Sequence, residues 1–168
     1  MFKQGDIVSY GTTGVCKIDG EMENKVKGEI KKYLVLKPVY QENSKVFVPM
    51  DNEELKDRMK PLLTAEEINE LIENMQGDDT QWILNDNERA GIFKDAIKGG
   101  DREKLVKMVR VLYLHRKTQL EKGRKLHASD EHYLKDAEKL LFDEFALVLG
   151  IDPDEVVGFI DKKLGIDK

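Results

Sequence analysis

The residues best suited to chemistry are one tryptophan and the basic side chains that follow it. Trp82 is the only tryptophan of the chain, and Arg89, Lys94 and Lys98 come after it. Basic side chains bind phosphates, and a flat apolar ring can wedge into a base step and hold a kink in nucleic acid. Lys94 and Lys98 are four residues apart, so a helix places them on one face, within reach of adjacent phosphates. The alternatives are a solvated helix face for the lysines and a place in the helical core for Trp82.

The charge is unevenly distributed along the chain. The whole chain has a net charge of −5, which argues against a general binder of polyanions. Residues 81–128, however, contain 12 Lys and Arg against 6 Asp and Glu, a net +6, and acidic blocks lie on both sides of them. A basic block of this kind is compatible with contact to nucleic acid, and equally with a solvated surface.

The elements that would position these residues fall into two groups, of which the first is built of strands. Residues 7–18, 32–37 and 44–49 are rich in β-forming residues, and turn residues separate them about every ten positions. Gly28 marks the turn of a hairpin between the second and third strands. Four or five short strands of this spacing predict a small SH3- or Tudor-like β-barrel over residues 1–60.

After Pro61 the apolar residues take the spacing of helices. Thr64 and Glu67 form a capping box, and an acidic linker or hinge is placed between residues 76 and 86. Further helices are expected to begin at three caps, Asp101, Ser129 and Asp152. The fold class is thus α+β with two domains: a β domain over 1–60, a helix and acidic linker over 61–80, and an all-α domain over 81–168.

Signs of catalysis are missing from the sequence. The chain has no glycine-rich phosphate loop, no paired cysteines and no His-Glu-x-x-His helix, so we expect neither a cofactor nor a metal. The single cysteine, Cys16, is expected to be a small buried residue, and the three histidines to be surface or capping residues. Without a signal peptide or an apolar span, the protein is expected in the cytoplasm, with no membrane partner. An enzyme of unknown type would need a convergent polar pocket that the sequence does not announce.

Several segments, taken in order, resemble the CarD family of bacterial transcription regulators. The opening Phe2-Lys3-Gln4-Gly5-Asp6-Ile7-Val8 and the later Val46-Phe47-Val48-Pro49 are similar to the family's first domain. Trp82, Gly100-Asp101 and the helical run 105–113 are similar to its second domain. The resemblance covers nearly the whole chain, and the order and spacing of the segments make it specific.

This resemblance implies a non-enzymatic regulator that acts on RNA polymerase. The first domain is expected to dock on the polymerase β subunit, largely by strand-edge contacts, with Asn24, Lys45 and Phe47 among the docking residues. The second domain is expected to meet promoter DNA at the upstream edge of the transcription bubble, largely without sequence specificity. There Trp82 would wedge at the minor groove while Arg89, Lys94 and Lys98 hold phosphates, changing the stability of the open complex. The free protein is expected to be a monomer, associated with the nucleoid through the polymerase.

The sequence also departs from the family pattern. The segment 83–87 intervenes between Trp82 and the next basic residues, which in many members follow the tryptophan almost directly. Asn24 and Phe47 stand where some members have arginine. Alternation along the strand puts Lys45 and Phe47 on one face and Val46 and Val48 on the other, and one of these pairs is expected to face the core. Residues 116–125 contain a second basic cluster, and the sequence does not decide which cluster would face DNA. A protein–protein adaptor that binds no DNA is the alternative function.

Overall fold

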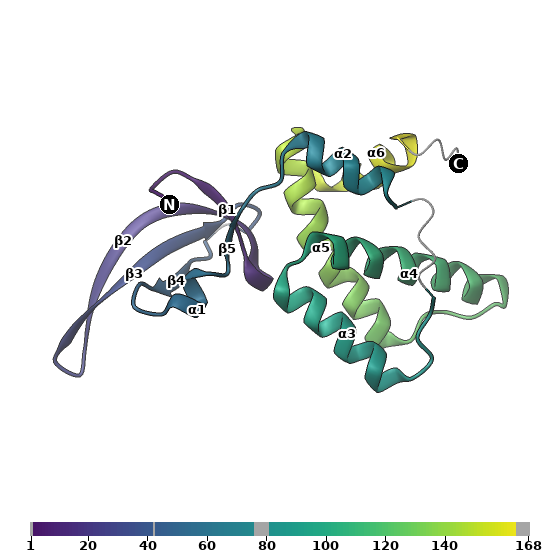
Figure 1. Cartoon of the computed structure of the whole chain (residues 1–168), viewed down its shortest axis with the longest axis horizontal. Coiled ribbons are helices and arrows are strands. Elements are labelled where there is room, and N and C mark those ends of the chain that lie inside the picture. Colours follow the sequence, from purple (N-terminus) through teal and green to yellow (C-terminus); the bar gives the residue numbers. More distant parts are fainter. Residues whose placement is uncertain (1, 42, 76–80, 164–168) are drawn as a thin grey trace. The chain divides into compact units, whose positions relative to one another are not determined.

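The chain divides into two compact units, Met1–Leu62 and Leu63–Lys168. The structure is a computed structural model that describes residues 2–41, 43–75 and 81–163. Strands build the first unit and helices the second (Figure 1), which confirms the α+β class with a β part followed by a helical part. The predicted domain limits stay a prediction, and part of the predicted linker, 76–80, lies outside the described residues.

The first unit is one antiparallel sheet in the order β4-β3-β2-β1-β5. Its elements are β1 (Ile7–Tyr10), η1 (Gly11–Thr13), β2 (Gly14–Val26), β3 (Glu29–Pro38), β4 (Val46–Pro49), α1 (Glu53–Lys56) and β5 (Met59–Pro61). A closed SH3- or Tudor-like barrel is not confirmed: among the described strands, β4 and β5 form the two edges and are not paired with each other. The sheet is therefore open, and β4 has one free edge.

One face of this sheet forms the core of the first unit. Val8, Cys16, Ile18, Leu36 and Val48 are buried together, and Val46 packs against them. The prediction of Cys16 as a small buried residue is confirmed, and burial raises the pKa of its thiol to about 11. In β4 the alternation is also resolved, because Val48 is buried while Phe47 points outward.

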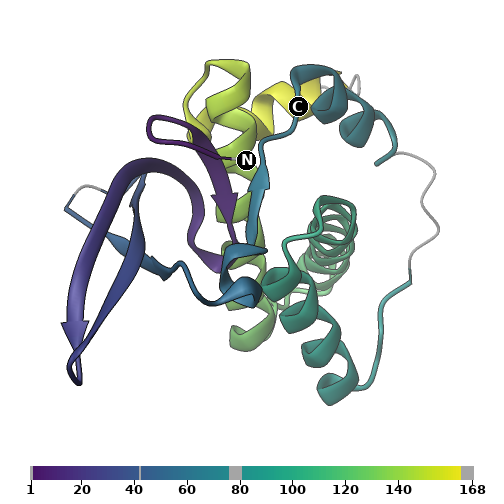
Figure 2. The ribbon, with the colours of Figure 1, turned by 60° about the vertical axis from the view of Figure 1, so that its left-hand side comes forward.

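The β2–β3 hairpin is the longest strand pair of the sheet, and Figure 2 shows it as a curved arm. Its turn is formed by Lys27 and Gly28, both of which have positive φ angles, 51° and 82°. A turn with two left-handed residues matches the twist of the strands that it joins, and this is why a glycine stands at position 28. The predicted turn at Gly28 is confirmed.

The described residues of the second unit form six helices. They are α2 (Ala65–Glu73), α3 (Asp86–Gly99), α4 (Arg102–Glu121), α5 (Ala128–Leu149), η2 (Pro153–Glu155) and α6 (Val156–Lys163). The Thr64–Glu67 capping box and the Asp101 cap are confirmed, since Thr64 Oγ1 accepts from the Glu67 N–H and Asp101 Oδ1 accepts from two amides of α4. The prediction of Ser129 as a cap is wrong: α5 begins at Ala128 and its first turn already contains Ser129.

The helical core lies where α5 packs against α3 and α4, and Figure 2 looks nearly along α4. Phe93 of α3, Leu112 of α4 and Phe145 of α5 are among its buried side chains. Ile68 and Ile72 of α2 are fully buried in the same core, so α2 is part of this unit. Glu144 is buried beside them and binds Arg102 through two bonds of 3.0 and 2.8 Å, while the same carboxylate accepts from the Leu63 amide at 2.9 Å.

Candidate nucleic-acid interface

Trp82 lies in the segment before α3, with its indole against three side chains of the helical unit. The His115 ring is stacked on it, with centroids 3.6 Å apart and planes 3° from parallel. The guanidinium carbon of Arg89 lies 4.4 Å from the centre of the indole, and Phe93 lies at 6.5 Å. Trp82 is partly buried, so the structure combines the two interpretations: the ring packs on the core and keeps part of its surface accessible.

Arg89 holds this arrangement together. Its Nε and Nη2 donate to the two carboxylate oxygens of Asp130, both at 3.0 Å, in a bidentate pair. Nη1 donates to the Ile83 carbonyl at 2.8 Å, and Nη2 also donates to Asp86 at 2.8 Å. The guanidinium thus connects the segment that contains Trp82 to α5. Asp130, its partner on α5, lies 41 residues after Arg89 in the sequence.

The prediction of Arg89 as a phosphate contact is corrected by this geometry. Arg89 is 3% exposed, and its donors are occupied by Asp130, Asp86 and Ile83. Burial lowers the pKa of Arg89, but the hydrogen bonds and charges of Asp130 and Asp86 more than offset it, so the group stays charged. Arg89 is therefore a positioning residue for Trp82 in this structure, and a phosphate would have to displace a buried carboxylate to reach it.

His115 was predicted to be an ordinary surface or capping residue, and its stacking on Trp82 was missed. Burial lowers the pKa of His115, and the positive charges of Arg89, His127 and Lys122 lower it further against the opposing effect of Asp130. The ring is therefore neutral at neutral pH and can stack without adding charge beside Arg89. Nothing in the sequence spacing indicates this contact, because 33 positions separate the two residues, and the same holds for the Arg89–Asp130 pair.

Lys94 and Lys98 are both exposed on α3, as predicted, but they do not lie with Trp82. The buried residues of α3 are Arg89, Phe93 and Ala96, and Trp82 contacts the first two of them. With 3.6 residues per turn, Lys94 and Lys98 lie on the opposite side of the helix. The structure thus groups the two lysines with each other and separates them from the tryptophan.

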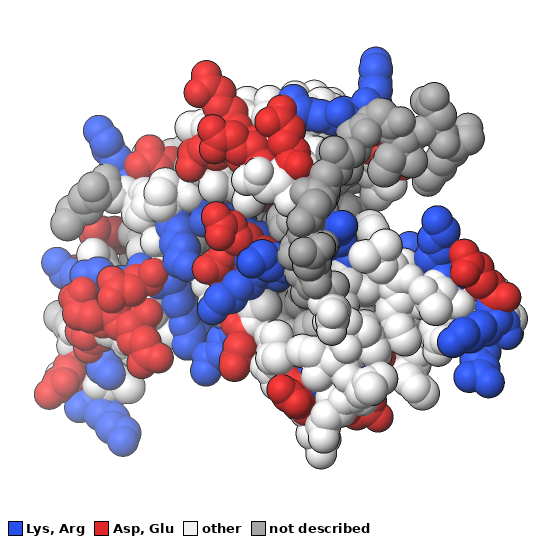
Figure 3. Space-filling model, turned by 45° about the vertical axis from the view of Figure 1, so that its right-hand side comes forward, with Lys and Arg blue, Asp and Glu red and all other residues white. Residues whose placement is uncertain are grey.

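The second basic cluster, Arg116, Lys117, Lys122, Arg124 and Lys125, lies at the end of α4 and in the loop that follows it. Of this cluster, Lys122 contributes to lowering the pKa of His115, whereas the Arg116 guanidinium lies 4.9 Å from the centre of the Tyr113 ring. Figure 3 shows Lys and Arg side chains at the right-hand edge of the view, with an acidic side chain among them, next to a surface of mostly uncharged side chains.

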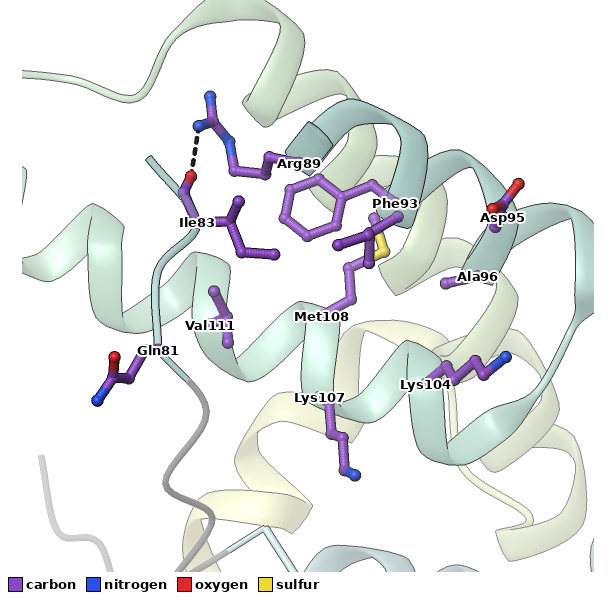
Figure 4. A pocket seen from close by; sticks show the side chains of 11 residues that line it. Gln81, Ile83, Arg89, Phe93, Asp95, Ala96, Lys104, Lys107, Met108 and Val111 are labelled. Atoms are coloured by element: carbon purple, nitrogen blue, oxygen red, sulfur yellow. Dashed lines mark hydrogen bonds between the residues drawn. The ribbon is translucent and has the colours of Figure 1, made fainter. Parts of the chain in front are cut away.

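A cavity of about 330 Å³ opens between α3 and α4 (Figure 4). Ile83, Phe93, Ala96, Met108 and Val111 give it a mostly apolar lining. Its polar lining consists of Gln81, Asp95, Lys104, Lys107 and Arg89, and Arg89 is already bound to Asp130. The described residues contain no group of His, Cys, Asp and Glu that could hold a metal ion, and no helix within them is long and apolar enough to cross a membrane.

The three residues predicted to bind the polymerase, Asn24, Lys45 and Phe47, are all exposed. Asn24 is paired with Lys31 and Phe47 with Val35. Because Lys31 and Val35 are an even number of residues apart on β3, Asn24 and Phe47 share the face of the sheet opposite the core. Lys45 lies immediately before β4, the edge strand.

Comparison with known proteins gives matches to both units. Residues 2–63 match the family model described as the CarD-like/TRCF RID domain, and residues 70–161 match the model described as the CarD C-terminal domain. A Bacillus subtilis (strain 168) protein, YdeB, named as a candidate transcription factor, is 24% identical over 159 residues. This alignment covers 95% of the present chain and 99% of YdeB.

Proposed function

This chain belongs to the CarD family and has a transcription-related role with RNA polymerase as the supported partner, and on that premise we propose that it regulates promoter opening without being an enzyme. In this proposal the first unit binds the polymerase β subunit. The helical unit meets promoter DNA near the upstream edge of the transcription bubble and changes the stability of the open complex. The observation that carries the proposal is that the two family matches follow each other along nearly the whole chain.

The polymerase contact is proposed for the outer face of the sheet and the edge of β4. Phe47 is 49% exposed beside the unpaired edge, and Asn24 lies on the same face. A free strand edge can add a strand of the partner through backbone hydrogen bonds, while the side chains on the face select the partner. An exposed phenylalanine calls for an apolar patch on the polymerase, with Lys45 available to an acidic neighbour.

The DNA contact is proposed for the surface around Trp82. Its exposed part would face the bases, and Lys122 of the second basic cluster, whose charge acts on His115 beside Trp82, would bind a phosphate. The salt dependence of such binding reports the number of phosphates that are neutralised. Lys94 and Lys98, the phosphate contacts predicted from the sequence, lie on the other side of α3 and outside this proposed contact, so they provide a direct comparison between the two clusters.

A pull-down with purified RNA polymerase tests the docking part of the proposal. We expect the full chain to be retained and Phe47→Glu to lose most of its retention, because a carboxylate cannot be buried against an apolar patch. Leu114→Glu is the matched control, since Leu114 is also an apolar residue that is 49% exposed but lies on α4 of the helical unit. Equal retention of the wild type and Phe47→Glu would place the docking surface elsewhere, and no retention of the wild type would remove the premise.

A protein adaptor without DNA contact is the second candidate. It is favoured by the net charge of −5 and by the packing of Trp82 against His115 and Arg89, which is also what a purely structural tryptophan would show. The two candidates differ in one observable. An adaptor would bind the polymerase and leave the lifetime of its open complexes unchanged on every promoter tested.

A further inference from the structure

The cavity between α3 and α4 has the size and the lining of a ligand-binding pocket. Its volume of about 330 Å³ falls within the range of roughly 300–1,000 Å³ that is usual for small-molecule pockets. Phe93 and Met108 are almost completely buried at its wall, whereas Ile92, which also lines it, is 46% exposed. Figure 4 shows Phe93, Ile83 and Met108 turned toward one another. An apolar group that enters this space is removed from water, which is favourable.

The charged side chains of the cavity are not balanced in sign. Lys104 and Lys107, three residues apart on one face of α4, are both exposed, and Asp95 of α3 lies on the other side of the opening (Figure 4). None of the ion pairs among the described residues includes these three side chains. Arg89 is already paired with Asp130. Two ammonium groups therefore stand against one carboxylate, which favours an anion.

A small organic carboxylate matches both the apolar wall and the excess of positive charge. Its apolar part would pack against Phe93 and Met108, while its carboxylate would stay at the opening beside the two lysines. There the charge keeps part of its water, so the cost of burying an ion is avoided. An amine of the same shape would instead be repelled by the lysines, and a polyphosphate has no apolar part to fill the cavity.

We propose that the cavity between α3 and α4 binds a small organic acid, an aromatic or short acyl carboxylate, with Lys104 and Lys107 as the residues that bind its charge. This inference goes beyond the proposed function and does not depend on it. The cavity adjoins Trp82, because Arg89 and Phe93 line it and their side chains lie 4.4 and 6.5 Å from the indole centre. Occupation of the cavity should therefore change the fluorescence of Trp82.

The test is a titration of the full chain with 4-phenylbutyrate, followed by Trp82 fluorescence and by NMR of labelled methionine methyl groups. Met108 lines the cavity, whereas Met22 and Met59 are strand residues of the other unit. We expect a saturable change in fluorescence together with a shift of the Met108 resonance, while the resonances of Met22 and Met59 stay in place. 4-Phenylbutylamine, which has the same apolar body and the opposite charge, should bind more weakly.

The double variant Lys104→Glu, Lys107→Glu tests the contact with the carboxylate. It should raise the Kd of 4-phenylbutyrate by about tenfold, since exposed charge pairs each contribute modestly, and lower the Kd of 4-phenylbutylamine. Both lysines are exposed, so the fold should hold. Lys94→Glu, Lys98→Glu is the matched control, because it makes the same change in net charge on the opposite side of α3 and should leave both Kd values unchanged.

Three results would overturn the inference. The first is a titration without a saturable change in Trp82 fluorescence or in the Met108 resonance. The second is equal affinity for the two probes, or an equal loss of affinity in the two double variants, because the lysines of the cavity would then have no specific part in binding. The third is a shift of Met22 or Met59 as large as that of Met108, which would place the binding elsewhere. Since polymerase and DNA are absent from the experiment, none of these results bears on the proposed function.

Discussion

Replacing Asp130 with alanine should loosen the segment that contains Trp82 and destabilise the helical unit. Asp130 is 2% exposed, and its two oxygens each accept a bond of 3.0 Å from Arg89. Its removal leaves two donors of a buried guanidinium unpaired, and breaking a buried ion pair from one side costs about 3–5 kcal/mol. Because Arg89 retains Ile83 and the exposed Asp86 as acceptors, we expect the lower end, about 3 kcal/mol.

At about 4 °C per kcal/mol for a unit of about 100 residues, the expected fall in Tm is about 12 °C. Trp82 is the only tryptophan, so its fluorescence follows the unfolding of the helical unit alone, without a contribution from the β unit. This choice of probe matters because a protein of two units need not unfold in a single two-state transition.

The double variant Arg89→Met, Asp130→Leu provides the control for this reasoning. It removes both charges together and replaces them with apolar side chains, so its free energy of unfolding should lie closer to the wild type than that of Asp130→Ala. In the double variant the Trp82 emission should still shift to the red, because Ile83 and the indole lose the guanidinium that holds them. A Tm of Asp130→Ala within 2 °C of the wild type would refute the positioning role of the ion pair.

Three further predictions follow from the pKa shifts and the placement of charge. Burial lowers the pKa of His115 below its ordinary 6.5. The neutral His115 ring therefore contributes to the stability of the fold above pH 6.5, and this contribution is lost as the pH falls. Trp82 fluorescence should change in acid, and His115→Phe should remove this change. The Cys16 thiol, with its pKa raised to about 11, should react slowly with a thiol reagent at pH 8 in the folded protein and rapidly after denaturation; fast reaction of the native protein would contradict its burial. Lys122→Glu should weaken DNA binding and reduce the salt slope by about 1, whereas Lys98→Glu should change neither, as measured by titration at several salt concentrations; the opposite result would place DNA on the outer side of α3.

Local features of the fold were predictable because each depends on neighbouring residues. The Thr64–Glu67 capping box and the turn at Gly28 follow from hydrogen-bonding side chains and from left-handed backbone. Strand alternation paired Lys45 with Phe47 but left open which pair faces the core, and the structure buries Val48. The start of α5 was placed at Ser129 because serine is a good cap, whereas the structure begins the helix at Ala128 with no side-chain cap. Rules of this kind locate an element more reliably than its first residue.

The candidate site was predictable only in part, because its geometry depends on contacts between distant residues. Trp82 could be singled out as a lone tryptophan beside a basic block, but its partners His115 and Asp130 lie 33 and 48 positions away. Arg89 looked like a phosphate contact because the sequence shows its charge and not its partner.

The most direct test of the central claim is the dissociation rate of open promoter complexes, measured with purified RNA polymerase in the presence and absence of the full chain. We expect the wild type to change this rate and Phe47→Glu, with the DNA-facing unit unaltered, no longer to do so at the same concentration. A rate that is the same with and without the wild type, although the polymerase retains the protein, would contradict the account and leave an adaptor that binds the polymerase without acting on promoter DNA.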